Sequence, residues 1–346
     1  MSKLKTAMVG FGFIAERGHA PAYAERGDVD VVAVADVSPA RRARAAAVFP
    51  GAKLFATHEE LLDAVGGSLD VVDVCTPPYV HANVALAAMD AGLHVVCEKP
   101  LATSERAARS MLSKAMEAKR VLFPAHNYRH APVVKAVRSA LAEGLVGNVH
   151  LVTLETFRPT HARGTAEWNP DWRRDARYAG GGIGMDHGPH TLYLAFEWLR
   201  SHPIAIAATL SSAPDATTEE TFSARVRFPT GQALATLTWT AGFRRVIYTL
   251  HGERGAIRVE DDDVEVSVMT GGEGNRRWDV VERAAPSEWS DAGHAHWFAS
   301  LFDDFRRAIV EEDYVSSGAR DAYACIQVIE AGYRSAGAGG AELGLS

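Results

Sequence analysis

The feature that most constrains the fold is an apolar segment near the N-terminus that runs into two closely spaced glycines. Residues 6–9 are predicted to form a buried strand, and Gly10 and Gly12 follow it directly. Gly10 permits a tight turn, Gly12 lets the backbone approach a pyrophosphate, and the small Ala15 allows helix and strand to pack closely. The N-terminus of the next helix offers unpaired N–H groups to phosphates. This pattern predicts dinucleotide binding, with an ordinary glycine turn as the alternative.

The expected second strand, residues 31–35, ends in an acidic residue, Asp36. A carboxylate at this position binds the ribose hydroxyls of NAD and repels the 2′-phosphate of NADP. We therefore predict NAD, although Arg41 and Arg42 lie close enough in sequence to bind a phosphate and leave NADP open. The cofactor contacts predicted in this region are Gly10, Gly12, Phe13, Ile14, Asp36 and Arg41.

Composition excludes several classes of protein. The net charge is −7 and no basic run exceeds two arginines, which argues against a nucleic-acid surface. The three cysteines lack the spacing of metal ligands, and we expect no metal. The N-terminus lacks a signal-peptide pattern, and no uncharged apolar run approaches about 18 residues. We expect a cytoplasmic protein with no membrane partner.

The order of predicted elements indicates an α/β protein with two domains. Strands and helices alternate up to about residue 123, as in a doubly wound parallel sheet. From Val149 onward, β segments follow one another without helices between them, which predicts a large open, mainly antiparallel sheet. Two helices, residues 295–310 and 320–336, close the chain. We place the dinucleotide-binding domain at 1–124 and a second domain at 125–346, whose last helix can pack back on the first domain.

The second domain contains too few helices to cover a sheet of this size. An open sheet face is commonly buried by self-association. We therefore predict a homodimer or homotetramer that packs through this sheet, the second domain serving both substrate binding and oligomerisation.

Polar residues follow three of the first domain's strands, at the end where open α/β sheets bind ligands. The fourth strand is followed by Thr76, Pro77 and His81, which either contact the cofactor or form only a rigid turn. The fifth strand is followed by Glu98 and Lys99, a charged pair that packing explains poorly. The sixth is followed by donors that could line a substrate pocket or bridge the domains, namely His126, Asn127, Tyr128 and Arg129.

Two further stretches carry candidate substrate contacts. The loop at 158–177 holds Trp168 and Trp172, which suit stacking on a sugar ring but could equally form an interface. A glycine-rich run at 180–184 precedes Asp186, His187 and His190, and suggests that the backbone closely approaches another group.

If this second stretch is helical, Asp186 and His190 share a face. A helix N-terminus lowers the pKa of a nearby histidine and favours the neutral base, so His190 is a candidate general base. Pro189 implies that the helix starts near Gly188 or kinks there. The alternative is a capping aspartate and a partly buried histidine. A zinc site is not expected, because no further ligand stands at suitable spacing.

Taken together, the glycine turn, Cys-Thr-Pro-Pro with His81, Glu98-Lys99-Pro100 and the glycine run before Asp186 and His190 resemble the Gfo/Idh/MocA oxidoreductases. The resemblance implies an N-terminal Rossmann domain and a C-terminal α/β domain built on an open sheet, assembled into dimers or tetramers. It also implies that Lys99 is the lysine of the Glu-Lys-Pro motif and that Asp186 and His190 match the family's aspartate and catalytic histidine. Many members carry an aspartate three residues after that histidine, where this chain has Tyr193.

These observations favour NAD-dependent oxidation or reduction of a secondary alcohol on a sugar, amino sugar or cyclitol. His190 would take the hydroxyl proton, Lys99 would hold the oxygen, and Asp186 would orient His190 or a neighbouring hydroxyl. The alternatives are a redox-neutral, glycoside-cleaving or epimerising enzyme, and an inactive nucleotide-sensing regulator. The predicted substrate contacts are Lys99, Asn127, Tyr128, Arg129, Trp168, Trp172, Asp186, His187 and His190.

Overall fold

The computed structural model describes residues 3–271, 275–283 and 294–345. Its internal contacts divide the chain into two compact units. Unit 1 contains residues 1–127, 162–180 and 292–326, and unit 2 contains residues 128–161, 181–291 and 327–346. The chain first passes from unit 1 to unit 2 after residue 127, three residues beyond the predicted boundary at 124. Two later segments, 162–180 and 292–326, belong to unit 1 again. The units are therefore not two consecutive stretches of chain.

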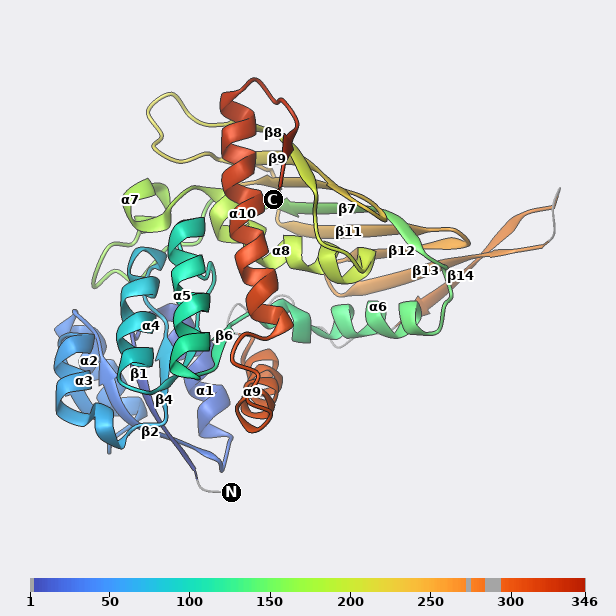
Figure 1. Ribbon diagram of the computed structural model, residues 1–346. Coiled ribbons are helices and arrows are strands. Elements are labelled where there is room, and N and C mark those ends of the chain that lie inside the picture. The colour runs from blue at the N-terminus through green and yellow to red at the C-terminus, as the bar shows by residue number, and fades with distance from the viewer. Residues whose placement is uncertain (1–2, 272–274, 284–293, 346) are drawn as a thin grey trace. The chain divides into compact units, whose positions relative to one another are not determined.

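Unit 1 is built on a six-stranded sheet in the order β3-β2-β1-β4-β5-β6, and all of its described strand pairs are parallel. This confirms the predicted doubly wound fold. Figure 1 shows its helices beside the strands. The strands are β1 (Leu4–Val9), β2 (Val29–Ala35), β3 (Lys53–Phe55), β4 (Val71–Val74), β5 (His94–Cys97) and β6 (Leu122–Pro124). The helices between them are α1 (Ala20–Ala24), α2 (Pro39–Val48), α3 (His58–Val65), α4 (His81–Asp90) and α5 (Glu105–Ala118).

Local signals fix where several of these helices begin. Ser38, Thr57 and Ser104 each accept a hydrogen bond from the backbone N–H three residues ahead, at 3.4, 3.2 and 3.2 Å. Each bond satisfies one of the donors that a helix start leaves unpaired. The short side chains before α2, α3 and α5 therefore act as N-caps.

Helix α9 (Ala295–Val310) completes the core of unit 1. Phe298, Phe302 and Phe305 lie buried in one cluster with Met8 and Phe11 near the glycine turn. The predicted helix at 295–310 is thus confirmed. Helix α10 (Ser317–Gly337) is shared, because its residues belong to unit 1 up to position 326 and to unit 2 from position 327.

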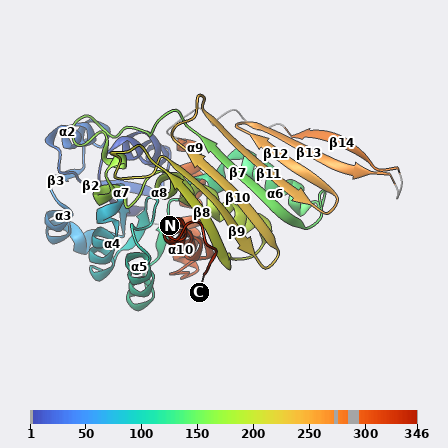
Figure 2. The same cartoon turned by 90° about the horizontal axis from the view of Figure 1, so that it is seen from above.

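Unit 2 is built on a mixed sheet of nine described strands, in the order β14-β13-β12-β11-β7-β10-β9-β8-β15. Figure 2 shows most of these strands side by side. The pair β7 and β10 is parallel and the other described pairs are antiparallel. The strands are β7 (Val149–Phe157), β8 (Ala205–Ser211), β9 (Thr221–Phe228), β10 (Gly231–Thr238), β11 (Arg245–Gly252), β12 (Gly255–Glu260), β13 (Asp263–Thr270), β14 (Arg277–Arg283) and β15 (Leu343–Gly344).

Two helices lie along this sheet. Helix α8 (Ile183–Leu199) packs on β7, β9 and β10, whereas α6 (Pro132–Ala142) packs on β13. The sequence did not indicate α6, β14 or β15. Within the described chain, no helix is both long and apolar enough to cross a membrane.

The structure shows where helix α8 begins. It starts at Ile183 and contains Pro189, so, of the two alternatives that Pro189 left open, a start near Gly188 is wrong. Its first turn is held by contacts from distant residues, described below, that the local sequence does not reveal. Asp186 and His190 therefore lie in one helix, which is buried along most of its length.

Candidate cofactor and active-site residues

The glycine turn after β1 has the geometry that a dinucleotide needs. Gly10 has φ +86°, and a Cβ there would lie 2.8 Å from the backbone of Cys75 and Thr76. A Cβ on Gly12 would meet no atom within 4 Å, so the backbone is open at that point. The Asp36 carboxylate accepts hydrogen bonds from the backbone N–H groups of Phe11, at 2.7 Å, and Ser38, at 2.8 Å. Because a carboxylate has about four acceptor sites, Asp36 retains capacity for ribose hydroxyls.

The two arginines that left NADP binding open, Arg41 and Arg42, both form hydrogen bonds within the protein. Arg41 is 5% exposed, and its guanidinium donates to Glu16, at 2.6 Å, and to the Phe11 carbonyl, at 2.6 Å. Arg42 donates to the Asp36 carbonyl at 2.7 Å. Arg41 thus stabilises the glycine turn, and binding a 2′-phosphate would require it to give up these bonds. Of the remaining predicted contacts here, Phe13 is exposed and Ile14 is half-buried.

The loops after β4 and β5 are joined by His81. Its ring is fully buried, with Nδ1 2.8 Å from the Pro100 carbonyl and Nε2 2.7 Å from the Thr76 carbonyl. Burial lowers the pKa of His81, and the two carbonyls oppose that shift. Pro77 follows Thr76 in an extended conformation. His81 therefore shapes these loops from inside the unit.

Two buried polar atoms at strand ends of unit 1 have no hydrogen-bond partner within the described chain. They are Oγ1 of Thr76, after β4, and Oδ1 of Asn127, after β6. Buried polar groups are rarely left unpaired, and open α/β sheets bind ligands at the carboxyl ends of their strands. Both atoms therefore fit a site that a cofactor or substrate completes.

Glu98 is held by a buried histidine that the sequence analysis missed. Its Oε1 lies 3.0 Å from Nε2 of His19, and its Oε2 accepts a hydrogen bond from the Lys99 backbone N–H at 3.0 Å. Nδ1 of His19 lies 2.7 Å from the Asp73 carboxylate. His19 falls in a stretch that we treated only as the helix after the glycine turn, and nothing local indicated its partners.

Tyr23 and Cys75 complete this polar cluster. The Tyr23 hydroxyl donates to Asp73 at 2.9 Å, and the Cys75 sulfur lies 3.6 Å from Nδ1 of His19. Burial by itself lowers the pKa of His19, but the Asp73 charge and hydrogen bond raise that pKa well above its usual value. His19, Asp73 and Cys75 offer ligand atoms within 4.8 Å of one another, as in a metal site. The hydrogen bonds among them account for the cluster without a cation.

Four predicted residues come together in unit 2. His190 is 8% exposed, and its ring stacks on Tyr128 with centroids 4.1 Å apart and planes 20° apart. The His187 ring lies 6.1 Å from that of His190, and its Nε2 is 3.8 Å from Oδ2 of Asp186. The structure therefore groups Asp186, His187 and His190 with Tyr128.

The observed start of α8 revises our argument from the helix dipole. The field of a helix N-terminus falls off within the first turn. Asp186 lies in that turn, whereas His190 lies beyond it. The field therefore acts on Asp186, and the helix dipole no longer supports a neutral His190.

Arg129 and Tyr193 pack into unit 2. The Arg129 guanidinium lies 5.2 Å from the centre of the Tyr193 ring, and its Nε is 3.5 Å from Glu197. Tyr193 is fully buried. The residue that replaces the family's second aspartate is therefore an internal packing residue here. The other donor predicted nearby, His126, is buried at 4% exposure.

The tryptophan loop lies with unit 1. The Trp168 ring is 5.4 Å from that of Tyr178, which is 5.1 Å from that of Tyr79. The Arg173 guanidinium lies 4.2 Å from the centre of the Trp172 ring. Trp168 is 37% exposed, so part of its ring is open to a ligand or partner. Its role in sugar stacking stays a prediction.

The close approach predicted at the glycine run has an internal cause. A Cβ on Gly180, which has φ +76°, would lie 2.7 Å from Cβ of Thr103. A Cβ on Gly181 would lie 2.1 Å from the Tyr333 hydroxyl, and one on Gly182 would lie 1.8 Å from the Glu219 carbonyl oxygen. These glycines are therefore required by neighbouring parts of the same chain.

Comparison with known families matches both parts of the chain. Residues 4–126 match a family model described as "Oxidoreductase family, NAD-binding Rossmann fold". Residues 134–258 match a model described as "GFO/IDH/MocA C-terminal domain". The two models together account for more than half of the sequence.

Relatives and solved structures agree with this match. D-glucoside 3-dehydrogenase of Escherichia coli (strain K12) is 31% identical over 191 residues, 55% of this chain and 52% of that protein. Inositol 2-dehydrogenase of Rhizobium meliloti (strain 1021) is 26% identical over 96% of both chains. A structure of levoglucosan dehydrogenase in complex with NADH superposes with a TM-score of 0.85 at 23% identity, covering all of both chains, which shows the shared fold. The alignment with D-glucoside 3-dehydrogenase thus spans about half of that relative's length, whereas the one with inositol 2-dehydrogenase spans nearly all of it.

Proposed function

Since the chain belongs to the Gfo/Idh/MocA family of oxidoreductases, we propose that it is an NAD-dependent dehydrogenase or reductase acting on a secondary alcohol of a sugar, amino sugar or cyclitol. The observation that carries this proposal is helix α8, which holds Asp186 and His190 in one helix with His190 stacked on Tyr128. The relatives, which include a glucoside dehydrogenase and an inositol dehydrogenase, support this substrate class.

Unit 1 supplies the cofactor site. When bound, NAD supplies the hydride acceptor or donor. The open backbone at Gly12, the spare acceptor capacity of Asp36 and the unpartnered Oγ1 of Thr76 fit such a ligand. Asp36 also favours NAD over NADP, because its charge would repel a 2′-phosphate.

Three side chains, those of His190, Lys99 and Asp186, have separate roles in the proposed reaction. In oxidation, His190 accepts the proton of the substrate hydroxyl. The hydride leaves the carbon that bears this hydroxyl, so that a carbonyl forms. The Lys99 ammonium donates a hydrogen bond to the substrate oxygen and polarises it. Asp186 orients His190 or a neighbouring hydroxyl. In reduction the same groups act in reverse, and His190 returns the proton to the oxygen.

The test is a screen of sugars, cyclitols and their keto forms, followed by the absorbance of reduced nicotinamide. We expect one substrate class to release NADH in proportion to the product formed. Product formation without net NADH would overturn the dehydrogenase assignment in favour of the redox-neutral reaction. Cofactor binding without turnover of any compound would favour the nucleotide-sensing regulator.

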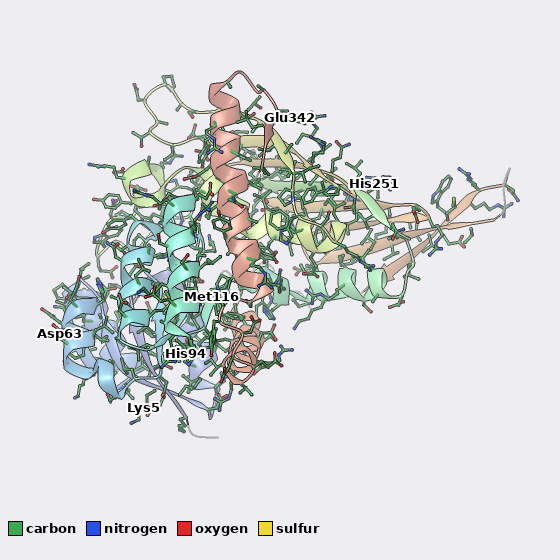
Figure 3. The ribbon with its side chains drawn as sticks, in the orientation of Figure 1. Lys5, Asp63, His94, Met116, His251 and Glu342 are labelled. Atoms are coloured by element: carbon green, nitrogen blue, oxygen red, sulfur yellow. The ribbon has the colours of Figure 1, made fainter. Side chains whose placement is uncertain are left out.

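We further propose that the protein forms a homodimer or homotetramer through the open face of the unit 2 sheet. Along β9 and β10 one set of alternating side chains is buried on the side that α8 covers, and the other set includes the exposed Arg225, Arg227 and Leu234. Both arginines lie 3.1 Å from Glu342, which Figure 3 labels. Leu234→Glu should lower the mass measured by analytical ultracentrifugation at micromolar concentration. A monomeric wild-type protein would contradict the proposal.

We also propose a cytoplasmic location. The three cysteines, Cys75, Cys97 and Cys325, are buried thiols. Thiols persist in reducing compartments.

A further inference from the structure

A single buried glutamate holds the start of helix α8. Glu219 is 6% exposed and lies just before β9. Its Oε2 accepts from the Gly182 N–H, and its Oε1 from the Gly184 N–H, both at 2.8 Å. Its own backbone carbonyl accepts from the Ile183 N–H at 3.3 Å. Three successive N–H groups at the start of α8 are thus satisfied by one residue that lies 35 to 37 positions away in sequence.

Tyr333 of α10 completes the arrangement. Its hydroxyl donates to Oε1 of Glu219 at 3.0 Å. A helix start leaves four N–H groups unpaired. Here Glu219 satisfies three of the four, those of Gly182, Ile183 and Gly184, and Tyr333 holds Glu219 in place.

The neighbours of Glu219 match a carboxylate. Both oxygens accept from donors, and a protonated acid would turn one O–H toward an N–H or toward Tyr333. Burial raises the pKa of Glu219 above its usual value, and the N–H groups of Gly182 and Gly184 oppose only part of that shift. A carboxylate at a helix N-terminus is also favoured by the helix dipole.

The glycine run is the counterpart of this arrangement. A Cβ on Gly181 would collide with the Tyr333 hydroxyl, and one on Gly182 with the Glu219 carbonyl. A Cβ on Gly184 would lie 2.8 Å from Phe222 and 3.0 Å from the Glu219 carboxylate. The glycines therefore let Glu219 and Tyr333 reach the backbone of α8.

We propose that Glu219 and Tyr333 are positioning residues that fix the first turn of α8 and thereby the placement of Asp186 and His190. This inference rests on the proposed function for its catalytic consequence. Asp186 lies in the turn that Glu219 holds, and His190 follows one turn later in the same helix. A frayed start would move Asp186 first, and a displacement of about 1 Å in a catalytic group lowers rates by about a hundredfold.

The central experiment compares Glu219→Gln with Glu220→Gln. The first variant keeps the shape of the side chain but turns an amide NH₂ toward a backbone donor. The second removes the same charge at the adjacent, half-buried position. We expect Glu219→Gln to lower kcat about 10- to 100-fold, with the KM for NAD unchanged, because the residues proposed to bind NAD lie in unit 1. Glu220→Gln should stay within about twofold of the wild type.

Two milder variants test the same arrangement in case Glu219→Gln does not fold. Tyr333→Phe removes only the hydroxyl and should lower kcat several-fold. Glu219→Asp keeps the charge on a shorter side chain and should recover part of the rate that Glu219→Gln loses. If kcat falls only in proportion to the folded fraction, or if the KM for NAD rises with it, the positioning role is wrong.

Hydrogen exchange tests the arrangement without any substrate. Peptides that cover residues 181–190 should exchange faster in Glu219→Gln and Tyr333→Phe than in the wild type or in Glu220→Gln. Wild-type protection of these amides in Glu219→Gln would overturn the inference even if the enzyme proved active. Faster exchange would support it even if no substrate in the screen were turned over, so the two proposals can fail separately.

Discussion

Each unit buries a carboxylate next to residues proposed for catalysis, but the two carboxylates have different partners. In unit 1, Glu98 and Asp73 share the imidazole of His19, at 3.0 and 2.7 Å. In unit 2, Glu219 accepts from backbone N–H groups and from Tyr333, none of which is charged. The group that holds Glu98 is a titratable imidazole whose pKa Asp73 raises well above its usual value, whereas Glu219 is held by backbone N–H groups and a tyrosine hydroxyl.

This difference separates two ways of fixing a functional segment. The loop that carries Lys99 depends on the protonation of a buried imidazole. Helix α8, which carries His190, depends on backbone geometry and on glycines that admit a distant side chain. We therefore expect a rise of pH through the pKa of His19 to loosen the Lys99 loop. Substitutions in the glycine run should loosen α8, as should protonation of Glu219, whose pKa burial raises.

The largest effect should come from the proposed reacting groups. His190→Ala removes the general base and should lower the rate of hydride transfer about 10²- to 10⁴-fold, with NAD affinity unchanged because His190 belongs to unit 2. Lys99→Ala should lower turnover and weaken substrate binding together. Lys99→Arg should rescue poorly, because a planar guanidinium does not replace a compact ammonium. Pre-steady-state kinetics at saturating NAD measure these changes, and wild-type rates in both alanine variants would refute the assigned roles.

The next effect should come from His19. His19→Gln leaves two carboxylates buried without a cation, and we expect the free energy of unfolding to fall by about 3 to 5 kcal/mol. Tyr23→Phe removes one hydrogen bond to the same Asp73 and should cost about 1 kcal/mol. Denaturant titration measures both. Equal stabilities of the two variants would show that the imidazole carries no charge.

The pH dependence of the wild type sharpens this test. The folded pKa of His19 lies well above the unfolded value of about 6.5. Its contribution to stability is therefore fully present below about pH 6.5 and is lost as pH rises through the folded pKa. His19→Gln should lack this alkaline loss.

A smaller effect should come from the choice of cofactor. Asp36→Ala removes the charge that repels a 2′-phosphate and should improve the kcat/KM ratio of NADP to NAD about tenfold. Arg42→Ala is the matched control, because Arg42 donates to the Asp36 carbonyl and should not change that ratio. A wild-type preference for NADP would contradict the assignment.

The smallest effect should come from His94 at the start of β5, labelled in Figure 3. Its Nδ1 accepts a hydrogen bond from the Val121 N–H at 3.0 Å, and burial lowers the pKa of His94 to about 4. A lowered pKa means that stability is present above about pH 6.5 and is lost as pH falls toward 4. The loss should be on the order of 1 kcal/mol after solvent screening. His94→Gln should remove it, and a stability profile of the variant that still declines over this range would contradict the assignment.

Local patterns accounted for unit 1 and much less of unit 2. Alternating strands and helices predicted the six parallel strands, because each βαβ unit is set by neighbouring stretches of sequence. In unit 2, the strands from β7 to β13 were recognisable, but not the parallel pairing of β7 with β10, whose partners, such as Leu151 and Gln232, lie 81 positions apart. Helix α6 gave no recognised signal, and Pro189 left open a start of α8 near Gly188 that proved wrong.

The sequence by itself determined the glycine turn, Asp36, the Lys99 loop and the spacing of Asp186 and His190, because each depends on residues within a few positions of one another. Only the tertiary structure decided what holds them. His19 reaches Glu98 across 79 positions, and Glu219 reaches Gly182 across 37. A buried polar group takes its partner from whichever segments folding brings beside it, and no local pattern records that choice.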